Sequence, residues 1–497
     1  MSIRLKSCSL LALVAGGMFL AAAPASAETI YSGGATLPFQ LYRQWFDCFY
    51  APLVGPRPAT CTAAKGYPAD GADVIAYAPV GSGAGVNALI GQTSVTATPS
   101  STPYETASIP YAEGTTGYGT GPNFWDFSGS DGTLTAANLG TGTGGYANTT
   151  TGALAARGPA IQVPSVGTPV TIPVNTTGLT ISRADPAGGA SGVYLSRKAY
   201  CGIFTGTITN WNDPVLTQDN NGVQYHANRP ITVVRRSDSS GTTFLLSRHL
   251  EQVCNGGFDG ASSNNNHTGT AAGNLADWTG GAATTVTWPT TGTFVSAAGS
   301  EGVARVVSQT VGAIGYVSPD FTLMIANPVP LEDPVTHAAV ANPQVAVLQN
   351  QARFASATHT GAQPSITNTR AGIVSFTAPP ATVAGQTASA WSTALDSAAL
   401  RNPTGTSAYP MVGFTMLDFY TCYFPANETA VIKEFVSWIT GHHATITRAE
   451  ADELAEDNGF VALTQTQSDA VWNWINNASR GMRTGPISGT CTIASGT

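Results

Sequence analysis

Hydrophobic residues along the 497-residue chain follow two kinds of pattern. Short runs of apolar and β-branched residues are typical of buried strands, whereas apolar residues that recur every three or four positions are typical of amphipathic helices. The pattern predicts strands at 28–32, 74–78, 161–175, 231–234, 312–317 and 409–423, with 161–175 as a buried strand pair. It predicts helices at 39–49, around 86–90, and at 195–204, 244–250, 299–309, 428–441 and 447–458. Because strands and helices alternate along the chain, the expected fold class is α/β, with sheets flanked by helices.

Three of the predicted helices start directly after a strand and a turn of small residues. The residues at these starts are Thr36 and Leu37, then Ser82 in the turn Gly81 to Gly85, and then Ser240, Gly241 and Thr242. The first N–H groups of a helix have no acceptor within the helix, and the helix dipole places partial positive charge there. Each start is therefore a candidate anion site.

The turn at 235–243 also carries charged side chains. The planar guanidinium of Arg236 suits a pair of phosphate or carboxylate oxygens, and Asp238 is in reach to hold it in place. The alternative for this stretch is an ordinary Ser/Thr-capped helix beside a surface salt bridge. Asp131 follows a predicted strand and is a further candidate for the site. The alternative interpretation is a simple aspartate in a turn.

Three segments are rich in Gly, Thr, Ser, Asn or Ala and have little periodicity: 94–125, 140–156 and 255–285. They are expected to be surface insertions, and solvated loops are the plain interpretation. Thr447 and Glu450 form the spacing of a capping box at the last predicted helix. The serine in Gly81 to Gly85 lacks the flanking glycines of a nucleophile elbow, and no P-loop lysine is present.

Residues 1–27 have the form of a signal peptide. Arg4 and Lys6 precede an apolar stretch, which ends at Ala25-Ser26-Ala27, a small-x-small cleavage site. Removal of this segment changes the formal charge from −8 to −10. An exported protein is expected, in the periplasm or outside the cell. No later stretch is long and apolar enough for a membrane span, and the scarcity of lysine and of basic runs argues against nucleic acid as a partner.

Six cysteines remain after the signal segment: Cys48, Cys61, Cys201, Cys254, Cys422 and Cys491. An even number in an exported chain predicts disulfides. Six cysteines allow about 15 pairings. Neighbours in sequence are the simplest choice, which gives the hypothesis 48–61, 201–254 and 422–491. No pair has CxxC spacing, and the histidines are scattered, so neither a metal site nor a catalytic residue nor a cofactor is predicted.

Seven ordered sequence blocks resemble one protein family. The blocks between Gly33 and Val317 are GGATLPFQLYRQWF, APVGSGAGVNALI, DFSGSDGTLTAANL, IQVPSVGTPVTIPVNTTGL, LSRKAYCGIFTGTITNWNDP, ITVVRRSDSSGTTFLLSRHL and GSEGVARVVSQTVGAIGYV. They are similar to the phosphate-binding proteins of bacterial phosphate ABC transporters, the PstS family, including the secreted DING-type phosphate binders. The DING opening itself is absent, and the insertions and the segment 325–408 exceed the family pattern.

The resemblance implies a periplasmic-binding-protein-like type II fold with two lobes, each a mixed sheet flanked by helices, and a ligand in the cleft between them. The lobes would comprise 28–174 with 409–497, and 175–408. The ligand would be inorganic phosphate, with arsenate as an analogue, and the implied residues are Thr36, Leu37, Ser82, Asp131, Arg236, Ser240, Gly241 and Thr242, with Asp238 clamping Arg236. Asp131 would accept the proton that phosphate carries and sulfate lacks.

The resemblance further implies phosphate capture by a monomer, with an ABC permease as a possible partner. Two other interpretations stay open. One is a secreted DING-like protein with phosphatase activity, which would need a metal cluster or an activated nucleophile. The other is a surface or structural role, for which the Gly/Thr/Asn-rich insertions would be suited.

Overall fold

The computed structural model describes the chain in segments. They are residues 29–50, 61, 73–91, 125–150, 152–183, 192–254, 277–323, 331–332, 339–340, 343–355, 360–423 and 426–485. The predicted signal segment, nearly all of the insertion at 94–125 and most of that at 255–285 lie outside these residues.

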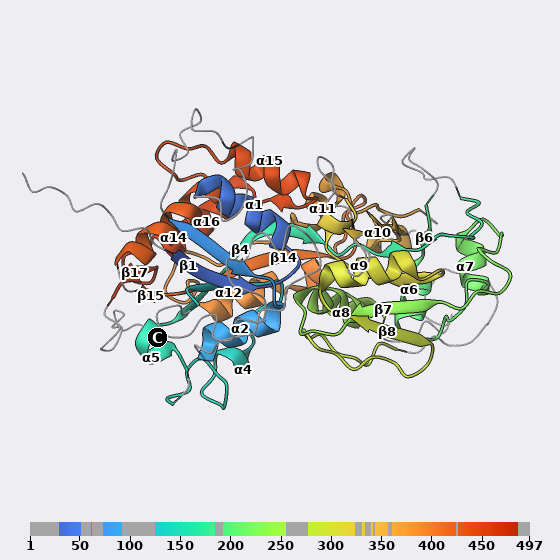
Figure 1. Cartoon of the computed structure of the whole chain (residues 1–497), viewed down its shortest axis with the longest axis horizontal. Coiled ribbons are helices and arrows are strands. Elements are labelled where there is room, and N and C mark those ends of the chain that lie inside the picture. Colours follow the sequence, from blue (N-terminus) through green and yellow to red (C-terminus); the bar gives the residue numbers. More distant parts are fainter. Residues whose placement is uncertain are drawn as a thin grey trace, which may run out of the picture.

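The larger of two main sheets has six strands in the order β16-β4-β14-β3-β1-β2. Its strands are β1 (Thr29–Gly34), β2 (Val74–Ala78), β3 (Phe127–Ser130), β4 (Ala160–Pro169), β14 (Val412–Tyr420) and β16 (Val461–Ala462). β1 pairs in parallel with β2 and β3, whereas β14 runs antiparallel between β3 and β4. The C-terminal part of the chain thus returns to the sheet in which the chain starts, as the blue and orange strands of Figure 1 show.

The second main sheet has five strands in the order β12-β5-β9-β7-β8. Its strands are β5 (Pro173–Val174), β7 (Thr232–Arg236), β8 (Thr293–Ala297), β9 (Ala313–Gly315) and β12 (Gln344–Val345). β7 pairs in parallel with β8 and β9, while β5 is antiparallel to β9. In Figure 1 the strands β7 and β8 of this sheet lie to the right of the six-stranded sheet, with α9 above them and α8 to their left.

Helices surround both sheets. Near the six-stranded sheet are α1 (Phe39–Phe49), α2 (Ser82–Gly91), α11 (Ile366–Ile373), α12 (Ala388–Leu395), α14 (Ala426–Ile439), α15 (Ala449–Asp457) and α16 (Gln465–Ile475). With the five-stranded sheet are α6 (Arg197–Phe204), α7 (Pro214–Asp219), α8 (Gly241–Val253) and α9 (Gly299–Gln309). The short elements are α4 (Ala136–Leu139), α5 (Leu154–Arg157), α10 (Gln351–Ala355), α13 (Ala398–Arg401), η3 (Pro319–Phe321), β6 (Tyr194–Leu195), β10 (Leu331–Glu332), β11 (Ala339–Val340), β13 (Val347–Leu348), β15 (Cys422–Tyr423) and β17 (Arg483–Thr484).

The predicted α/β class is confirmed, because apolar faces on both sheets are covered by helices. α1 illustrates the packing: its Tyr42 and Phe46 rings contact Tyr77 of β2, and Phe46 also contacts Phe435 of α14. All four side chains are buried. Aromatic pairs of this kind add to the free energy of burial. In the part of the chain that the structure describes, no helix is both long and apolar enough to span a bilayer.

Two predictions of local structure are wrong. The stretch 161–175 is not one strand pair, because β4 belongs to the six-stranded sheet and β5 to the five-stranded one, and the chain crosses between them where Thr171 bridges Val317. The capping box at Thr447 does not form either: α15 starts after Arg448, which makes no capping hydrogen bond. A capping box occurs instead at Thr464, the cap of α16, a helix that the hydrophobic pattern did not predict.

Two of the three predicted disulfides are confirmed, Cys48–Cys61 and Cys201–Cys254. Cys422 is disulfide-bonded as well, while its predicted partner Cys491 lies outside the described residues.

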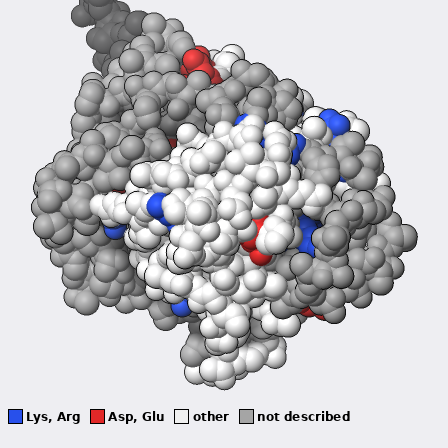
Figure 2. Space-filling view, turned by 90° about the vertical axis from the view of Figure 1, so that its right-hand side faces the viewer, with Lys and Arg blue, Asp and Glu red and all other residues white. Residues whose placement is uncertain are grey.

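Charged side chains are sparse on the end of the molecule that carries α7. Among the described residues visible in Figure 2, Lys, Arg, Asp and Glu appear singly and do not gather into a basic or acidic patch. This face therefore has no strong field of one sign in the view shown.

Candidate functional site

Residues from both main sheets meet at one place. β1, β2 and β3 are parallel, so the turns after their carboxyl ends lie at the same edge of the six-stranded sheet, and they carry Thr36, Ser82 and Asp131. β7 of the five-stranded sheet ends at Arg236 and leads into α8. The starts of α1, α2 and α8 thus stand around one small region.

Arg236 is the centre of this region. Its side chain is buried, and its guanidinium donates from Nη2 to the Thr36 hydroxyl at 2.9 Å and from Nη1 to the Thr242 hydroxyl at 3.3 Å. The alternative of a surface salt bridge is therefore wrong. The guanidinium thus stands between the ends of the two sheets, and these contacts fix its orientation.

Asp238 holds the guanidinium on its other edge. Oδ1 accepts from Arg236 Nε at 2.7 Å, and Oδ2 contacts Nη2. Burial alone would raise the pKa of Asp238, but the Arg236 charge and the Arg236 hydrogen bonds outweigh it, so the pKa lies below its ordinary value. Asp238 is thus ionised at neutral pH and keeps the Arg236 fork in one orientation.

Ser82 and Gly241 form a second direct contact between the two halves of the region. The Gly241 N–H donates to Ser82 Oγ at 3.1 Å, and the Asp131 N–H donates to the same oxygen at 3.2 Å. A Cβ atom at Gly241 would lie 2.5 Å from both Asp131 Cβ and Ser82 Oγ. Glycine is therefore required here by the close approach of its neighbours.

Asp131 is a buried carboxyl rather than a turn residue at the surface. Its Oδ1 has no hydrogen-bond partner among the described residues. Burial raises the pKa of Asp131 to about 7, although Thr415, Arg236 and Ser82 oppose the shift. A buried acceptor of this kind can take a proton or a hydrogen bond from a protonated ligand.

Ser240 is an ordinary helix cap, which is the role that the alternative interpretation of the sequence gave it. Its hydroxyl oxygen accepts from the Thr243 N–H at 3.2 Å and caps α8. This leaves the first N–H groups of α8, including that of Thr242, near Arg236 and without an acceptor within the helix. Leu37 is buried beside Thr36 just before α1.

The sequence did not identify three residues that contact the predicted set. Ser300, on the first turn of α9, accepts from Arg236 Nη1 at 3.4 Å, and Tyr316 accepts from the Arg236 backbone N–H at 3.0 Å. The carbonyl of Thr284 accepts from the Ser240 N–H at 2.9 Å. Ser300 stands at the start of a predicted helix, so the helix-start rule could have found it, whereas no local signal marks Tyr316 or Thr284.

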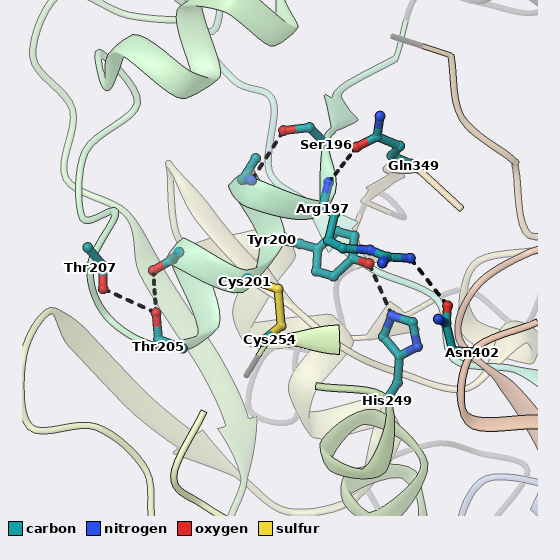
Figure 3. The surroundings of a disulfide bond; sticks show 12 residues. Ser196, Arg197, Tyr200, Cys201, Thr205, Thr207, His249, Cys254, Gln349 and Asn402 are labelled. Carbon is teal, nitrogen blue, oxygen red and sulfur yellow. Dashed lines mark hydrogen bonds between the residues drawn. A yellow bond between two sulfur atoms is a disulfide. The ribbon is translucent and has the colours of Figure 1, made fainter. Parts of the chain in front are cut away.

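The far end of α8 is held rigidly. Cys254 follows α8 and is joined to Cys201 of α6, as Figure 3 shows. Figure 3 also shows His249 of α8 next to Tyr200 of α6. The His249 Nδ1–H donates to the Arg401 carbonyl at 2.7 Å, which leaves Nε2 to accept from the Tyr200 hydroxyl at 3.1 Å. Burial lowers the pKa of His249 to about 3, so the ring is neutral at physiological pH. These contacts fix the direction in which α8 presents its first turn.

A metal centre has no support in the described segments, where no three His, Cys, Asp or Glu side chains gather closely enough to hold an ion. The adjacent histidines 442 and 443 turn to different partners, Asp469 and Glu434. Asp418 is buried and accepts from Gln162 at 2.6 Å and from Ser128 at 3.3 Å. It is therefore a hydrogen-bonded core residue.

Comparisons with known proteins show the family of the chain. The family model of the PBP superfamily domain matches residues 62–442, more than half of the chain. Alkaline phosphatase L of Pseudomonas aeruginosa is 28% identical over 462 residues, 92% of each chain, and a phosphate-binding protein of an unknown prokaryotic organism is 30% identical over 324 residues, 63% of this chain and 72% of the relative. The solved structure of a high-affinity periplasmic phosphate-binding protein, PfluDING bound with phosphate, is similar with a TM-score of 0.57 and 26% identity, and the match covers 92% of this chain and 96% of that one. The chain therefore belongs to the PBP superfamily and, within it, to the PstS-type phosphate-binding proteins with DING-type features.

Proposed function

We propose that the protein binds inorganic phosphate between two lobes, one built on each main sheet. Phosphate is held by the helix starts at Thr36–Leu37, Ser82 and Ser240–Thr242 and by Arg236. The observation that carries the proposal is the position of Arg236: it is clamped by Asp238 and at the same time donates to Thr36 of the other sheet. An anion at this point has donors from both lobes.

The number of donors is sufficient for tight binding. A hydrogen bond to a charged group contributes roughly 1.5–3 kcal/mol net, and micromolar affinity needs about −8 kcal/mol. A few of the predicted contacts therefore suffice even after the cost of removing water from the anion. The formal charge of −8 of the whole chain does not oppose this, because distant charges are screened and local donors are not.

Asp131 supplies the choice of anion. A carboxylate only accepts hydrogen bonds, so it pairs with the proton that phosphate or arsenate carries at neutral pH. Sulfate has no proton and would bring a second acceptor against the buried, unpaired Oδ1. Leaving two acceptors face to face in a buried site costs binding free energy.

The biological role that fits these properties is phosphate capture by an exported monomer, in the periplasm or outside the cell, for uptake through an ABC permease. The relatives that support it include the periplasmic phosphate-binding protein PfluDING and a protein named phosphate-binding protein PstS. Titration calorimetry of the protein without residues 1–27 tests the proposal, with phosphate, arsenate and sulfate as ligands. Phosphate and arsenate are expected to bind with one site per chain and sulfate not to bind; absence of phosphate binding would refute the proposal.

A second candidate function follows from the relatives that are named alkaline phosphatase L. A phosphatase assay with and without a chelator separates it from simple binding. Turnover that disappears when metal is removed would favour the enzyme, and saturable phosphate binding without turnover would favour capture. A surface role without phosphate binding is the third interpretation, and the same calorimetry decides it.

A further inference from the structure

The strand β14 passes directly beside Asp131. Met416 of β14 pairs with Ser130 in the antiparallel ladder between β14 and β3. The next residues along these two segments are Thr415 and Asp131, which therefore stand opposite each other where the ladder ends. Both side chains are buried. A hydroxyl group from the middle of the six-stranded sheet is thus a neighbour of the carboxyl that is proposed to choose the anion.

A β-bulge lies at Thr415. On the other edge of β14, Thr415 pairs with Val166 of β4 and Met416 pairs with Pro164, so Ser165 is the extra residue of the bulge. Bulges change the direction of nearby side chains and are frequent beside functional sites. Ser165 Oγ donates to the Thr415 carbonyl at 3.1 Å. The irregular register is therefore held at the residue that stands opposite the carboxyl.

The Thr415 hydroxyl has a second neighbour, the phenol of Tyr42 in α1. The two oxygens lie 3.4 Å apart, and the Tyr42 oxygen lies 2.7 Å from Ser165 Oγ. Because the hydrogen of Ser165 goes to the Thr415 carbonyl, Tyr42 donates to Ser165, and the Tyr42 oxygen is left to accept. The Thr415 hydrogen thus has two acceptors to choose between, Tyr42 and Asp131. An ionised carboxylate is the stronger of the two.

The groups around Asp131 make its charge sensitive to such a donor. Burial raises the pKa of Asp131 to about 7, and among the groups that oppose this shift Thr415 acts most strongly, ahead of Arg236. Other titratable side chains that interact with the Asp131 charge come from four elements: Tyr42 of α1, Tyr77 of β2, Asp320 of η3 and Asp418 of β14. Burial raises the pKa of both tyrosines, so they stay neutral, and it raises the pKa of Asp320 to about 8 and that of Asp418 to about 7.

We propose that Thr415 is a positioning residue of the phosphate site, whose hydroxyl donates to ionised Asp131 and turns to Tyr42 when Asp131 takes up a proton. This inference rests on the proposed phosphate site and on the role of Asp131 in it. Donation by Thr415 stabilises the charged carboxylate, which accepts a hydrogen bond from a protonated anion and disfavours sulfate. Thr415 therefore sets the pH below which sulfate can bind.

Replacement of Thr415 by Val removes the hydroxyl and keeps the branched shape. Without this donor Asp131 takes up its proton at a higher pH, so sulfate affinity at pH 8.5 should be about tenfold above that of the wild type. At pH 5.5, where Asp131 is protonated in both proteins, the two sulfate affinities should agree within about threefold. Thr415→Ser restores the hydroxyl and should follow the wild-type profile. Competition of sulfate with labelled phosphate at each pH measures the profile, with phosphate affinity determined by calorimetry.

Two further variants separate the hydroxyl from its packing. Thr168→Val is the matched control, because it removes another buried threonine hydroxyl of the same sheet, one that donates to the Pro169 carbonyl. Its sulfate profile should be that of the wild type. Tyr42→Phe removes the alternative acceptor of Thr415, which disfavours protonated Asp131. The sulfate profile of Tyr42→Phe should therefore move to lower pH, opposite to that of Thr415→Val.

The outcomes are distinct. If the wild type does not bind phosphate, the proposed function itself fails. If the wild type binds phosphate and Thr415→Val keeps the wild-type sulfate profile, the inference is wrong and the proposed function stands. Profiles of Thr415→Val and Tyr42→Phe that move in the same direction would show an effect of lost packing and would also overturn the inference. Should Thr415→Val fail to fold, the direction of the Tyr42→Phe shift decides.

Discussion

Nη2 of Arg236 lies 2.9 Å from the hydroxyl oxygen of Thr36, although the two residues are 200 positions apart in the chain. The bond joins the end of β7 in the five-stranded sheet to the turn between β1 and α1 in the six-stranded sheet. Each residue alone indicates no more than a helix start or a salt bridge. Together they define a point where donors from both sheets converge.

Replacement of Asp131 by Asn tests the choice of anion. The amide can donate to sulfate, which the carboxylate cannot. Sulfate affinity is expected to rise at least tenfold, about 1.4 kcal/mol, in calorimetric titrations. Asp418→Asn is the matched control, because it removes another buried carboxylate of the same region that is already paired with Gln162 and Ser128. An unchanged ratio of phosphate to sulfate affinity in Asp131→Asn would contradict the role of Asp131.

The same carboxyl predicts a pH dependence of selectivity. The pKa of Asp131 is raised to about 7 by burial, so the free protein takes up a proton there as the pH falls below 7. A protonated carboxyl donates a hydrogen bond, and sulfate affinity should therefore increase from pH 8 to pH 5.5. Competition between labelled phosphate and sulfate measures the effect. Asp131→Asn should lack this pH dependence, and a flat profile in the wild type would count against the assignment.

Replacement of Arg236 by Lys keeps the charge and removes the fork. An ammonium group cannot donate to Thr36 and Thr242 while it is held along one edge by Asp238. Phosphate affinity is expected to fall by a factor of about 10 to 100, or 1.4–2.8 kcal/mol. Arg370→Lys at an exposed ion pair with Glu456 is the control and should bind as the wild type does. If Arg236→Lys bound phosphate as tightly as the wild type, the positive charge alone would account for the effect of Arg236 on binding.

Replacement of Gly241 by Ala tests the close contact with Ser82 and Asp131. The added methyl group would overlap Asp131 Cβ and Ser82 Oγ, each 2.5 Å away, and overpacking of this kind costs about 1–3 kcal/mol. Because the overlap exists only where the two halves meet, the expected result is a loss of phosphate affinity of tenfold or more with little change in melting temperature. Gly142→Ala, where an added Cβ meets no atom within 4 Å, should change neither quantity.

Asp320 predicts how stability varies with pH. Burial raises the pKa of Asp320 from 3.8 to about 8, so the folded state favours the neutral carboxyl. The contribution of Asp320 to the free energy of unfolding is fully present below pH 3.8. It is lost as the pH rises toward 8, at up to about 1.4 kcal/mol per pH unit. Asp320→Asn removes this loss, so the variant should gain stability over the wild type as the pH increases from 4 to 8. Urea denaturation at several pH values measures it, with Glu453→Gln at an exposed residue as control; a difference independent of pH would refute the prediction.

Local sequence was sufficient for much of the fold. The helices 39–49 and 299–309 and the strand 74–78 have the predicted bounds, because apolar spacing and a proline or glycine at the boundary act within a few residues. The prediction of local structure failed where one sequence pattern is compatible with two different structures. The run 161–175 is apolar in both of its strands, and only the tertiary structure assigns β4 and β5 to different sheets. The capping box predicted at Thr447 does not form, because α15 starts at Ala449 and Arg448 occupies the cap position.

For the candidate site, too, some features could be predicted from the sequence and others depend on the tertiary structure. The sequence by itself determined which residues can bind an anion, because helix starts, hydroxyls and a guanidinium have that capacity wherever they stand. Only the tertiary structure decided that Arg236 reaches Thr36, that Gly241 touches Asp131, and that Ser300 and Tyr316 join them. It also decided the burial of Asp131, which raises the pKa of that carboxyl. Burial and contact between distant residues depend on how the whole chain packs, and for that reason no stretch of sequence contains them.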